Sequence, residues 1–554
     1  MTYCELHCHS YYSLLAGTDS PETLVTRAAE LGLPALALTD HDAVYGAVEF
    51  AAAAQQHGLQ PIFGAELTLT GGQHLPLLVE NETGWGNLCS LISHARRNAP
   101  KGQASLPPDI LADHTAGLIA LSGGRRGEMA AALRHGDEDS ALAAGRRYRD
   151  WFGPDNFWIE LQHHLLPDDD QRVAQLMALV NKLGLGYVAT NNVHTATRAG
   201  QPLQDVLTGI RHLTPLSRAG SLLRPNSESY LKSARQLAPL FADFPAALSS
   251  TLRLAERCRF DLRYGLPELP AFPTSDGMTA IEYLRRLCLA RPIDEQAQRQ
   301  LAHELAIIER AGLANYFMIV WDIVRFCRAQ GIRCQGRGSA ANSLVAYRLG
   351  LSPIDPLTHD LVFERFLSPE RTAPPDIDLD IQADRREEVI QYVYRRYGHD
   401  HAAMACTTVT FRERSARRDV ARVLELPPEL LADEPPTANP QMLQARDLCR
   451  QLEGLPRHLG IHNGGLVLTA APLAERLPIE PATMPDRWVV QWDKDSLATA
   501  GLVKIDLLGL RMLSALAEAE RHLTPLRLDS LTFDDPTVYE MIAAGDTLGV
   551  FQVE

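Results

Sequence analysis

The carboxylates of residues 376–380 have the spacing of a metal site. This segment reads DIDLD, so that acidic and aliphatic side chains alternate. Because a strand has a period of two, Asp376, Asp378 and Asp380 would project from one face. Aligned acids repel one another unless a cation lies among them, and paired divalent ions held by carboxylates promote displacement at phosphorus. The alternative is a solvated strand edge whose acids contact only water.

A second charged segment favours the metal interpretation. Residues 501–510, GLVKIDLLGL, are apolar enough for a buried strand, yet Lys504 and Asp506 lie on one face of it. Buried charges need partners, and a metal for Asp506 and a triphosphate for Lys504 would supply them. Residues 336–339, GRGS, lead into a helical pattern, so we expect this loop and the helix N-terminus to form a phosphate cradle.

Four motifs of this region resemble the palm of the bacterial C-family DNA polymerases, the alpha subunits of DNA polymerase III. They are GRGSAANSLVAY, FERFLSPER, PPDIDLDI and LVKIDLLGL, in this order. The resemblance implies two Mg²⁺ ions held by the catalytic residues Asp376, Asp378 and Asp506, with Asp380 as a neighbour that does not bind metal. It also implies that the residues in contact with the nucleotide phosphates are Arg337, Gly338, Ser339, Arg365 and Lys504.

Composition limits the class of protein. A chain of 554 residues is too long for one hydrophobic core, and its 45% apolar and 22% charged residues are ordinary for a soluble globular protein. The sequence has neither a run of eighteen apolar residues nor the layout of a signal peptide, so we expect a cytoplasmic protein without a membrane segment. The nine cysteines are scattered singly, which favours reduced thiols over a disulfide framework.

Residues 411–422, FRERSARRDVAR, concentrate positive charge in a chain whose formal net charge is −15. Net charge says little about a local groove, and binding of a DNA backbone needs only a local cluster of cations. The candidate DNA contacts are Arg412, Arg414, Arg417, Arg418 and Arg422. The alternative is a helix face on which these arginines pair with Glu413 and Asp419.

The N-terminal third alternates strand and helix patterns. We predict strands over residues 3–8, 35–39, 61–69, 117–122, 157–162 and 187–190. Polar residues follow or lie within several of these strands, as in His7-Cys8-His9, Asp40-His41-Asp42, Glu66 and Asn192-Val193-His194. Repeated βα units with polar strand ends predict a parallel barrel whose rim collects ligands, and imidazole with carboxylate suits transition-metal ions.

This region resembles the PHP domain, a polymerase-and-histidinol-phosphatase module that heads the C-family chains. The resemblance implies metal ligands at His7, His9, His41, Glu66, His94 and His194. Three ligand positions depart from the family pattern, because Ala16 and Asn192 replace aspartates and Gly124 replaces a cysteine. We therefore expect a mainly structural domain with weak Zn²⁺ or Mn²⁺ binding at most, and with little or no proofreading.

These observations predict an α/β chain, with an N-terminal PHP (βα) barrel-like domain followed by a nucleotidyltransferase-type α+β palm that carries a helical thumb insertion. The expected boundaries are 1–235 for the PHP domain, 236–275 for a linker, 276–405 and 462–511 for the palm, 406–461 for the thumb and 512–554 for the start of the fingers. In the family the rest of the fingers, a helix-hairpin-helix and a sliding-clamp motif lie further on. We therefore expect the front half of a polymerase, which alone lacks full activity.

The resemblance implies a DNA-directed DNA polymerase that adds dNMPs to a primer 3′ end on a template. FRERSARRDV, QWDKDSL and GVFQVE resemble the error-prone branch, which serves translesion synthesis in DNA repair, and the alternative is the replicative subunit. Expected partners are primer–template DNA, dNTPs, and the sliding clamp with other accessory proteins. A PHP-type phosphoesterase is the rival enzyme, disfavoured by Ala16, Gly124 and Asn192. A non-catalytic scaffold would have no use for Lys504 and Asp506 on a buried strand.

Overall fold

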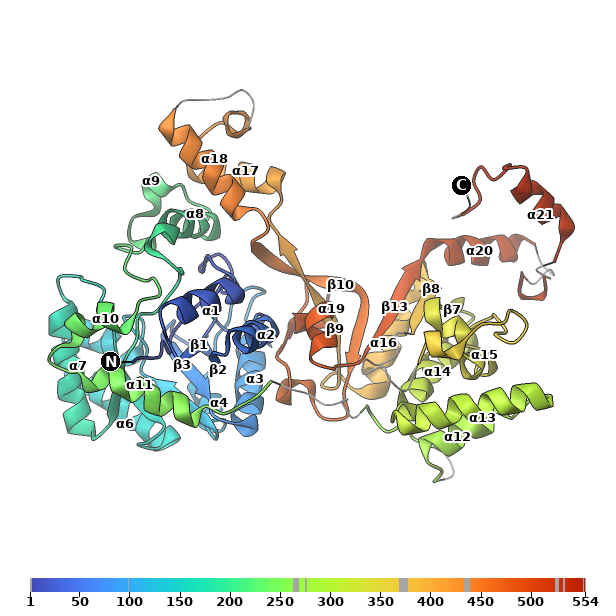
Figure 1. Cartoon of the computed structure of the whole chain (residues 1–554), viewed down its shortest axis with the longest axis horizontal. Coiled ribbons are helices and arrows are strands. Elements are labelled where there is room, and N and C mark those ends of the chain that lie inside the picture. The colour runs from blue at the N-terminus through green and yellow to red at the C-terminus, as the bar shows by residue number, and fades with distance from the viewer. Residues whose placement is uncertain are drawn as a thin grey trace. The chain divides into compact units, whose positions relative to one another are not determined.

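The computed structural model describes residues 2–97, 99–262, 269–274, 277–367, 377–432, 439–523, 528–531, 534–551 and 553. The chain divides into two compact units, whose elements are labelled in Figure 1. Unit 1 comprises Met1–Gly265, Ala403–His462 and Pro472–Ala500, and unit 2 comprises Leu266–Ala402, Asn463–Ala471 and Gly501–Glu554. Each unit therefore collects segments that are far apart in the sequence, and the expected domain boundaries stay predictions.

A six-stranded sheet with the order β1-β2-β3-β4-β5-β6 forms the centre of unit 1. Its strands are β1 (Ala35–Leu38), β2 (Gln60–Thr68), β3 (His74–Val79), β4 (Leu118–Leu121), β5 (Phe157–Leu161) and β6 (Gly186–Ala189). All neighbouring strands are parallel except β3, which is antiparallel to both β2 and β4. The predicted strands from residue 35 onward are confirmed, whereas β3 was not predicted.

The N-terminal segment joins the two edges of this sheet. Glu5 bridges Leu36 of β1, and Cys8 bridges Val193, which follows β6. The amide of Val193 donates to the carbonyl of His7 at 2.9 Å. The prediction of a continuous strand over residues 3–8 is wrong, because the segment makes isolated bridges instead. These bridges nevertheless close the sheet, so the expected barrel-like α/β fold is confirmed.

Helices flank the sheet, as Figure 1 shows. They are α1 (Pro21–Glu30), α2 (Ala47–His57), α3 (Glu82–Arg97), α4 (Pro108–Ala112), α5 (Glu128–Arg134), α6 (Glu138–Phe152), α7 (Asp169–Leu183), α8 (Gln201–Arg211), α9 (Leu216–Ala219), α10 (Ala234–Leu237) and α11 (Ala246–Arg257). Ser20 caps α1 by accepting the amide of Thr23, and α2 ends at Gly58 in the left-handed region. Apolar side chains of every strand, among them Ile62 and Trp158, pack with Leu254 of α11 into one core.

Two later segments complete unit 1. Helices α17 (Glu413–Val423) and α18 (Pro440–Leu452) share an apolar cluster with α8, in which Val420 and Leu452 pack with Leu207. Strand β9 (Ala402–Thr410) pairs in parallel with β12 (Trp488–Asp493), which pairs antiparallel with β11 (Ile479–Pro481) and precedes α19 (Lys494–Thr499). The expected helical thumb insertion therefore packs on α8 and is preceded by strand β9.

The segment around β11 and β12 is bound to the barrel by hydrogen bonds from buried aromatic side chains. Trp492 Nε1 donates to the carbonyl of Val44 at 3.0 Å, and the Tyr45 hydroxyl donates to Glu480 Oε2 at 2.9 Å. Trp85 Nε1 donates to the carbonyl of Arg476 at 2.8 Å. Trp85 and Trp492 are almost fully buried. This segment is thus an integral part of unit 1.

The sheet of unit 2 carries the acidic strands. Strand β8 (Asp378–Gln382) lies between β7 (Cys334–Arg337), to which it is antiparallel, and β13 (Lys504–Leu510), to which it is parallel. The last residues of β10 (Pro456–Leu468) pair antiparallel with β13. The helices are α12 (Ala280–Cys288), α13 (Glu295–Arg310), α14 (Ala314–Ala329), α15 (Leu344–Arg348), α16 (Arg386–Tyr397), α20 (Arg511–His522) and α21 (Pro536–Ala543). Every helix among the described residues is too short or too polar to span a bilayer.

Candidate functional site

Charged residues of three neighbouring strands form one row across the sheet of unit 2. In the parallel pairing of β13 with β8, Asp506 lies directly opposite Asp378. In the antiparallel pairing of β8 with β7, Asp378 lies directly opposite Arg337. Residues paired in this way project from the same face of a sheet. Two carboxylates and a guanidinium group therefore project side by side.

Two cations contact the carboxylates of this row. Lys504 Nζ lies 2.7 Å from Asp506 Oδ2. The guanidinium group of Arg337 lies 3.5 Å from Asp378 Oδ2 and 3.7 Å from Asp380 Oδ1. Burial raises the pKa of Asp380 above its ordinary value, and Arg337 opposes this rise. Lys504 and Arg337 thus offset part of the negative charge that gathers here.

The environment of Asp506 fits a divalent cation. Its Oδ1 is buried and has no hydrogen-bond partner among the described residues. A buried carboxylate oxygen without a partner is costly, and a second carboxylate, that of Asp378, lies beside it on β8. Two adjacent carboxylates, one with an unused buried oxygen, are suitable oxygen ligands for a hard divalent ion. Asp376, the third expected ligand, lies outside the described residues.

The turn after β7 has the expected position beside the acids. Gly338 has a φ of 71° and opens a short 3₁₀ helix, η4 (Gly338–Asn342), immediately after Arg337. Glycine adopts this left-handed conformation without the steric penalty that a side chain would cause. Ser339 is half-buried in the same turn. Arg337, Gly338 and Ser339 therefore follow one another at the end of β7, next to Asp378.

The N-terminus of α15 is not the open anion site that the sequence predicted. The buried carboxylate of Glu304, on α13, accepts the amides of Leu344 at 2.9 Å and Val345 at 3.0 Å. It also accepts the hydroxyl of Ser343 at 2.8 Å. This part of the prediction is wrong because a carboxylate of the chain itself already binds the amides that an external phosphate would use.

Arg365 ends the short helix η5 (Phe363–Arg365) and is exposed. Helix η5 packs against η4, so Arg365 comes from an element that adjoins the turn after β7. Among the described residues, no ion pair or hydrogen bond joins Arg365 to the acidic row. Its expected role at the phosphates stays a prediction.

The five arginines of α17 and its N-terminal flank divide into two groups. Arg417 pairs with Glu413, while Arg418 and Arg422 lie 3.1 Å and 3.8 Å from the buried carboxylate of Asp419. Arg412 and Arg414 are exposed and form no ion pair with any described residue. Three of the five arginines therefore fit the alternative of a salt-bridged helix face. The other two, Arg412 and Arg414, remain available to an external anion.

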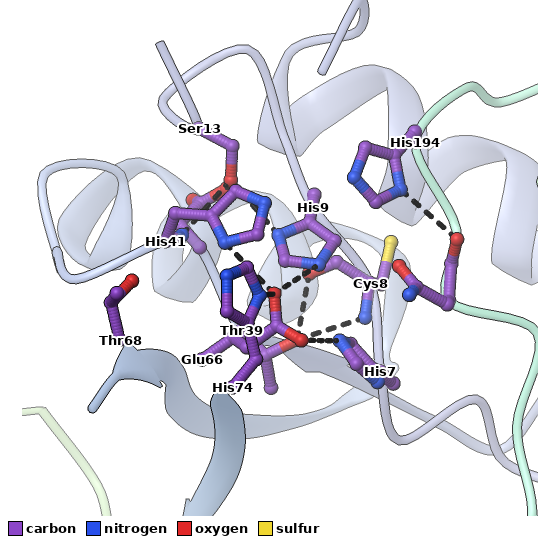
Figure 2. A network of polar contacts seen from close by, with 12 residues as sticks. His7, Cys8, His9, Ser13, Thr39, His41, Glu66, Thr68, His74 and His194 are labelled. Atoms are coloured by element: carbon purple, nitrogen blue, oxygen red, sulfur yellow. Dashed lines mark hydrogen bonds and ion pairs between the residues drawn. The ribbon is translucent and has the colours of Figure 1, made fainter. Parts of the chain in front are cut away.

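Glu66 of β2 is the centre of a histidine cluster in unit 1, which Figure 2 shows from close by. His41 Nδ1 lies 2.8 Å, His74 Nδ1 3.0 Å and His7 Nε2 3.3 Å from the carboxylate of Glu66. The ring of His9 lies 4.3 Å from that of His41 and 4.2 Å from that of His194. Five of the six expected PHP residues therefore meet here, together with His74.

His94 does not join this cluster. It lies in the last turn of α3, where its ring is 5.9 Å from that of His114. His74, the first residue of the unpredicted strand β3, contacts Glu66 instead. Because no strand was predicted around residue 74, no local pattern placed this histidine at the barrel rim.

Electrostatics divides the cluster into charged and neutral members. Burial would raise the pKa of Glu66, but His74, His41 and His7 together hold it well below its ordinary value. Burial lowers the pKa of His7, yet Glu160 and Glu66 outweigh it and raise the value to about 10. Burial, reinforced by His194 and His41, holds the pKa of His9 well below its ordinary value.

One part of the cluster fits a metal ion. The Nε2 atoms of His7 and His9 are buried without a hydrogen-bond partner among the described residues. Both atoms face the Glu66 carboxylate, at 3.3 Å and 3.7 Å. Unused imidazole nitrogens beside a carboxylate suit a transition-metal ion such as Zn²⁺. His9 and Glu66 could therefore hold a single ion together with His7, once His7 has lost the proton that Glu160 and Glu66 stabilise.

The part of the cluster around His194 has ligand atoms of His9, His41 and His194 within 4.8 Å of one another, but its surroundings are less suited to a metal ion. Ala16, Gly124 and Asn192, which replace the expected ligands, all line the cavity that adjoins His194. A side chain at position 124 would place its Cβ 2.1 Å from Oε1 of Gln162, so Gln162 occupies the space of the missing thiol. The guanidinium group of Arg224 lies 2.6 Å from Nε2 and 2.8 Å from Nδ1 of His194. A cation of the chain thus adjoins His194, and this disfavours a metal ion there.

Family comparisons agree with the order of these sites along the chain. The PHP domain matches residues 5–164, the bacterial DNA polymerase III alpha NTPase domain matches residues 278–509, and the bacterial DNA polymerase III alpha subunit finger domain matches residues 506–554. Over these residues the chain is similar to the bacterial DNA polymerase III alpha subunit.

Curated relatives specify the branch of this family that the chain resembles. Error-prone DNA polymerases of Mycobacterium tuberculosis, Symbiobacterium thermophilum and Nocardia farcinica are 42%, 41% and 40% identical to it over 592, 601 and 632 residues. Each match covers 100% of this chain but 54% or 55% of the relative. The chain thus spans about half the length of these relatives.

Proposed function

We propose that this chain carries the catalytic centre of an error-prone, DNA-directed DNA polymerase. The observation that carries the proposal is the pairing of Asp506 with Asp378 on adjacent parallel strands, with one buried oxygen of Asp506 unused. The names of the relatives support the error-prone branch over the replicative alternative. The reaction is the addition of dNMPs to a primer 3′ end, and the complete polymerase would act in translesion synthesis during DNA repair.

The proposed cofactors are two Mg²⁺ ions, held by Asp378, Asp506 and Asp376. Bound divalent ions lower the pKa of an attacking hydroxyl and offset charge on a phosphate that is being transferred. Lys504 and Arg337 contact Asp506 and Asp378 in the present structure. When cations occupy the carboxylates, these two side chains become available to the triphosphate, and with Ser339 and Arg365 they would neutralise it.

The proposed partners are primer–template DNA and dNTPs. Arg412 and Arg414 support contact with the DNA backbone because they are exposed and lack ion pairs among the described residues. The sliding clamp and other accessory proteins are further proposed partners of the complete polymerase, as in the family that the sequence resembles.

Substitution of single carboxylates in a complete polymerase that carries this segment tests the proposal. Asp378→Asn and Asp506→Asn should each reduce Mg²⁺-dependent primer extension by about 10²-fold or more, while binding of primer–template DNA stays unchanged. Asp380→Asn is the matched control, because it removes a carboxylate two residues further along the same strand and should retain extension. Normal extension by Asp378→Asn would refute the catalytic assignment.

Fidelity tests the branch assignment separately. A polymerase of the proposed branch should misincorporate dNTPs and extend past damaged template bases. Accurate synthesis that stops at lesions would refute the error-prone assignment and leave the assignment of the carboxylates intact.

A further inference from the structure

The cavity beside the histidine cluster of unit 1 is rich in arginine. It has a volume of about 290 Å³, and His41, Glu66 and His194 contribute to its lining. Glu66 is the sole carboxylate among the described residues that line it. Five arginines line the same cavity, namely Arg125, Arg126, Arg134, Arg211 and Arg224. Cationic side chains therefore far outnumber carboxylates on its wall.

Most of these guanidinium groups lack a carboxylate partner. Arg125 forms ion pairs with Asp168 and Asp169. Within the described part of the chain, no ion pair involves Arg126, Arg134, Arg211 or Arg224. Glu66 offsets part of the charge of Arg224 and Asp42 offsets part of that of Arg211, but neither carboxylate forms an ion pair with these arginines. The protein thus compensates the positive charge of the cavity only in part.

Arg224 connects the arginines to the histidine cluster. Its guanidinium group contacts both ring nitrogens of His194, and its Nε is buried without a hydrogen-bond partner among the described residues. A guanidinium group offers five N–H donors in a planar fork that matches the oxygens of a phosphate. Arginines that converge on a concave wall also focus a positive potential within it. The cavity therefore has the donors and the charge to hold an anion, and it has lost the carboxylates and thiolate that would hold further metal ions.

We propose that this cavity is a metal-independent binding site for a phosphate group, with the guanidinium groups of Arg126, Arg211 and Arg224 as its main ligands. The occupant is a free phosphate ion or the terminal phosphate of a nucleotide or oligonucleotide, since both present the same tetrahedral oxygens. The site binds this group without a covalent step. It belongs to unit 1 alone and does not depend on the proposed polymerase function.

Calorimetric titration of the whole chain in EDTA tests this site. The probes are inorganic phosphate, a 5′-phosphorylated trinucleotide and the same trinucleotide without its phosphate. The double variant Arg126→Gln/Arg211→Gln should bind phosphate at least about tenfold more weakly than the unsubstituted chain. Both residues are exposed, so the variant should fold, and its thermal melting without phosphate checks this. Arg235→Gln, on α10, replaces an exposed arginine outside the cavity and should bind normally.

The outcomes separate the possible occupants and can overturn the proposal. Tighter binding of the phosphorylated trinucleotide than of phosphate identifies a terminal phosphate as the ligand, and equal binding identifies the free ion. The variant Arg126→Lys/Arg211→Lys keeps the positive charge but replaces each planar guanidinium group with an ammonium group. It should bind phosphate with intermediate affinity. Absence of binding in EDTA, binding only after addition of Mn²⁺, or equal affinity of the Gln double variant and the unsubstituted chain would each refute the proposal.

Discussion

Asp506 lies directly opposite Asp378 in the parallel pairing of β13 with β8, although 128 positions separate them in the sequence. Two carboxylates on adjacent strands repel each other, and Lys504 offsets only part of this charge by contacting Asp506. The described residues therefore leave part of the negative charge of Asp378 and Asp506 without a neutralising cation.

Magnesium should stabilise the fold through these two aspartates. A ligand that binds only the folded state stabilises it, and at ten times its Kd the gain is about 1.4 kcal/mol. We expect Mg²⁺ to raise the free energy of unfolding by this amount, as measured by chemical denaturation. Asp506→Asn should abolish the gain, whereas Asp380→Asn should retain it. Equal gains in both variants would show that Mg²⁺ binds elsewhere.

Removal of the Glu304 side chain should destabilise unit 2. Its buried carboxylate accepts the amides of Leu344 and Val345 and the hydroxyl of Ser343. Glu304→Ala leaves these buried donors without partners, and we expect a loss of about 3 kcal/mol in the free energy of unfolding. Glu309→Ala is the matched control, because Glu309 lies on the same helix, is 55% exposed and should contribute less than about 1 kcal/mol. A similar loss in both variants would contradict the capping role of Glu304.

The two groups of arginines in residues 412–422 should differ in DNA binding. Arg414 is exposed and forms no ion pair with a described residue, while Arg418 lies 3.1 Å from the buried Asp419. Arg414→Ala should weaken binding of primer–template DNA and reduce the slope of log Kobs against log salt by about 1. Arg418→Ala should change this slope less, because Arg418 contacts the carboxylate of Asp419, which it shares with Arg422 and Arg457. A larger slope change for Arg418→Ala than for Arg414→Ala would contradict the proposal that Arg414, rather than Arg418, contacts the DNA backbone.

The apolar cluster that joins α18 to α8 should be sensitive to truncation. Leu452 is fully buried in this cluster. Leu452→Ala should lower the free energy of unfolding by about 3 kcal/mol, because it leaves a cavity. Leu443, on the same helix, is 49% exposed, and Leu443→Ala should cost about 0.5 kcal/mol or less. Chemical denaturation of the two variants measures the difference, and equal losses would contradict the packing.

His164 should make unit 1 less stable in mild acid. Burial lowers the pKa of this imidazole to about 4, against about 6.5 in an unfolded chain. Between these values the unfolded state binds the proton and the folded state does not, so stability falls as the pH drops from about 6.5 to about 4. Denaturation across this range should show a shallower fall for His164→Gln. His135→Gln, which alters an exposed residue after α5, should keep the original profile. An unchanged profile in His164→Gln would contradict this assignment.

The sequence predicted the strands of the acidic site better than it predicted how these strands pair. Alternation of acidic and aliphatic residues correctly placed Asp378 and Asp380 in one strand, β8, and the apolar stretch around Asp506 correctly indicated another, β13. The register that brings Asp378 opposite Asp506 depends on strand pairing over a long sequence distance, and no local pattern specifies it. The capping of α15 by Glu304 was missed for the same reason.

The histidine cluster shows a similar limit. Histidines beside predicted strands, such as His41 and His194, do reach the barrel rim. His74 was missed because no strand was predicted around it, and because β3 runs antiparallel in a barrel that was expected to be parallel. Arg224 was missed because an isolated arginine in an irregular segment has no signature, and only the fold brings it to His194.

The hydrogen bond between Trp492 and Val44 can form only after most of the chain has been translated. The two residues are 448 positions apart, and at 5 to 20 residues per second the interval between their synthesis is on the order of 20 to 90 s. Throughout this time the surface around Trp85 and Val44 lacks its covering segment. The nascent barrel therefore leaves an apolar surface exposed during translation, and chaperones that bind such surfaces should associate with the chain until residues near 500 emerge.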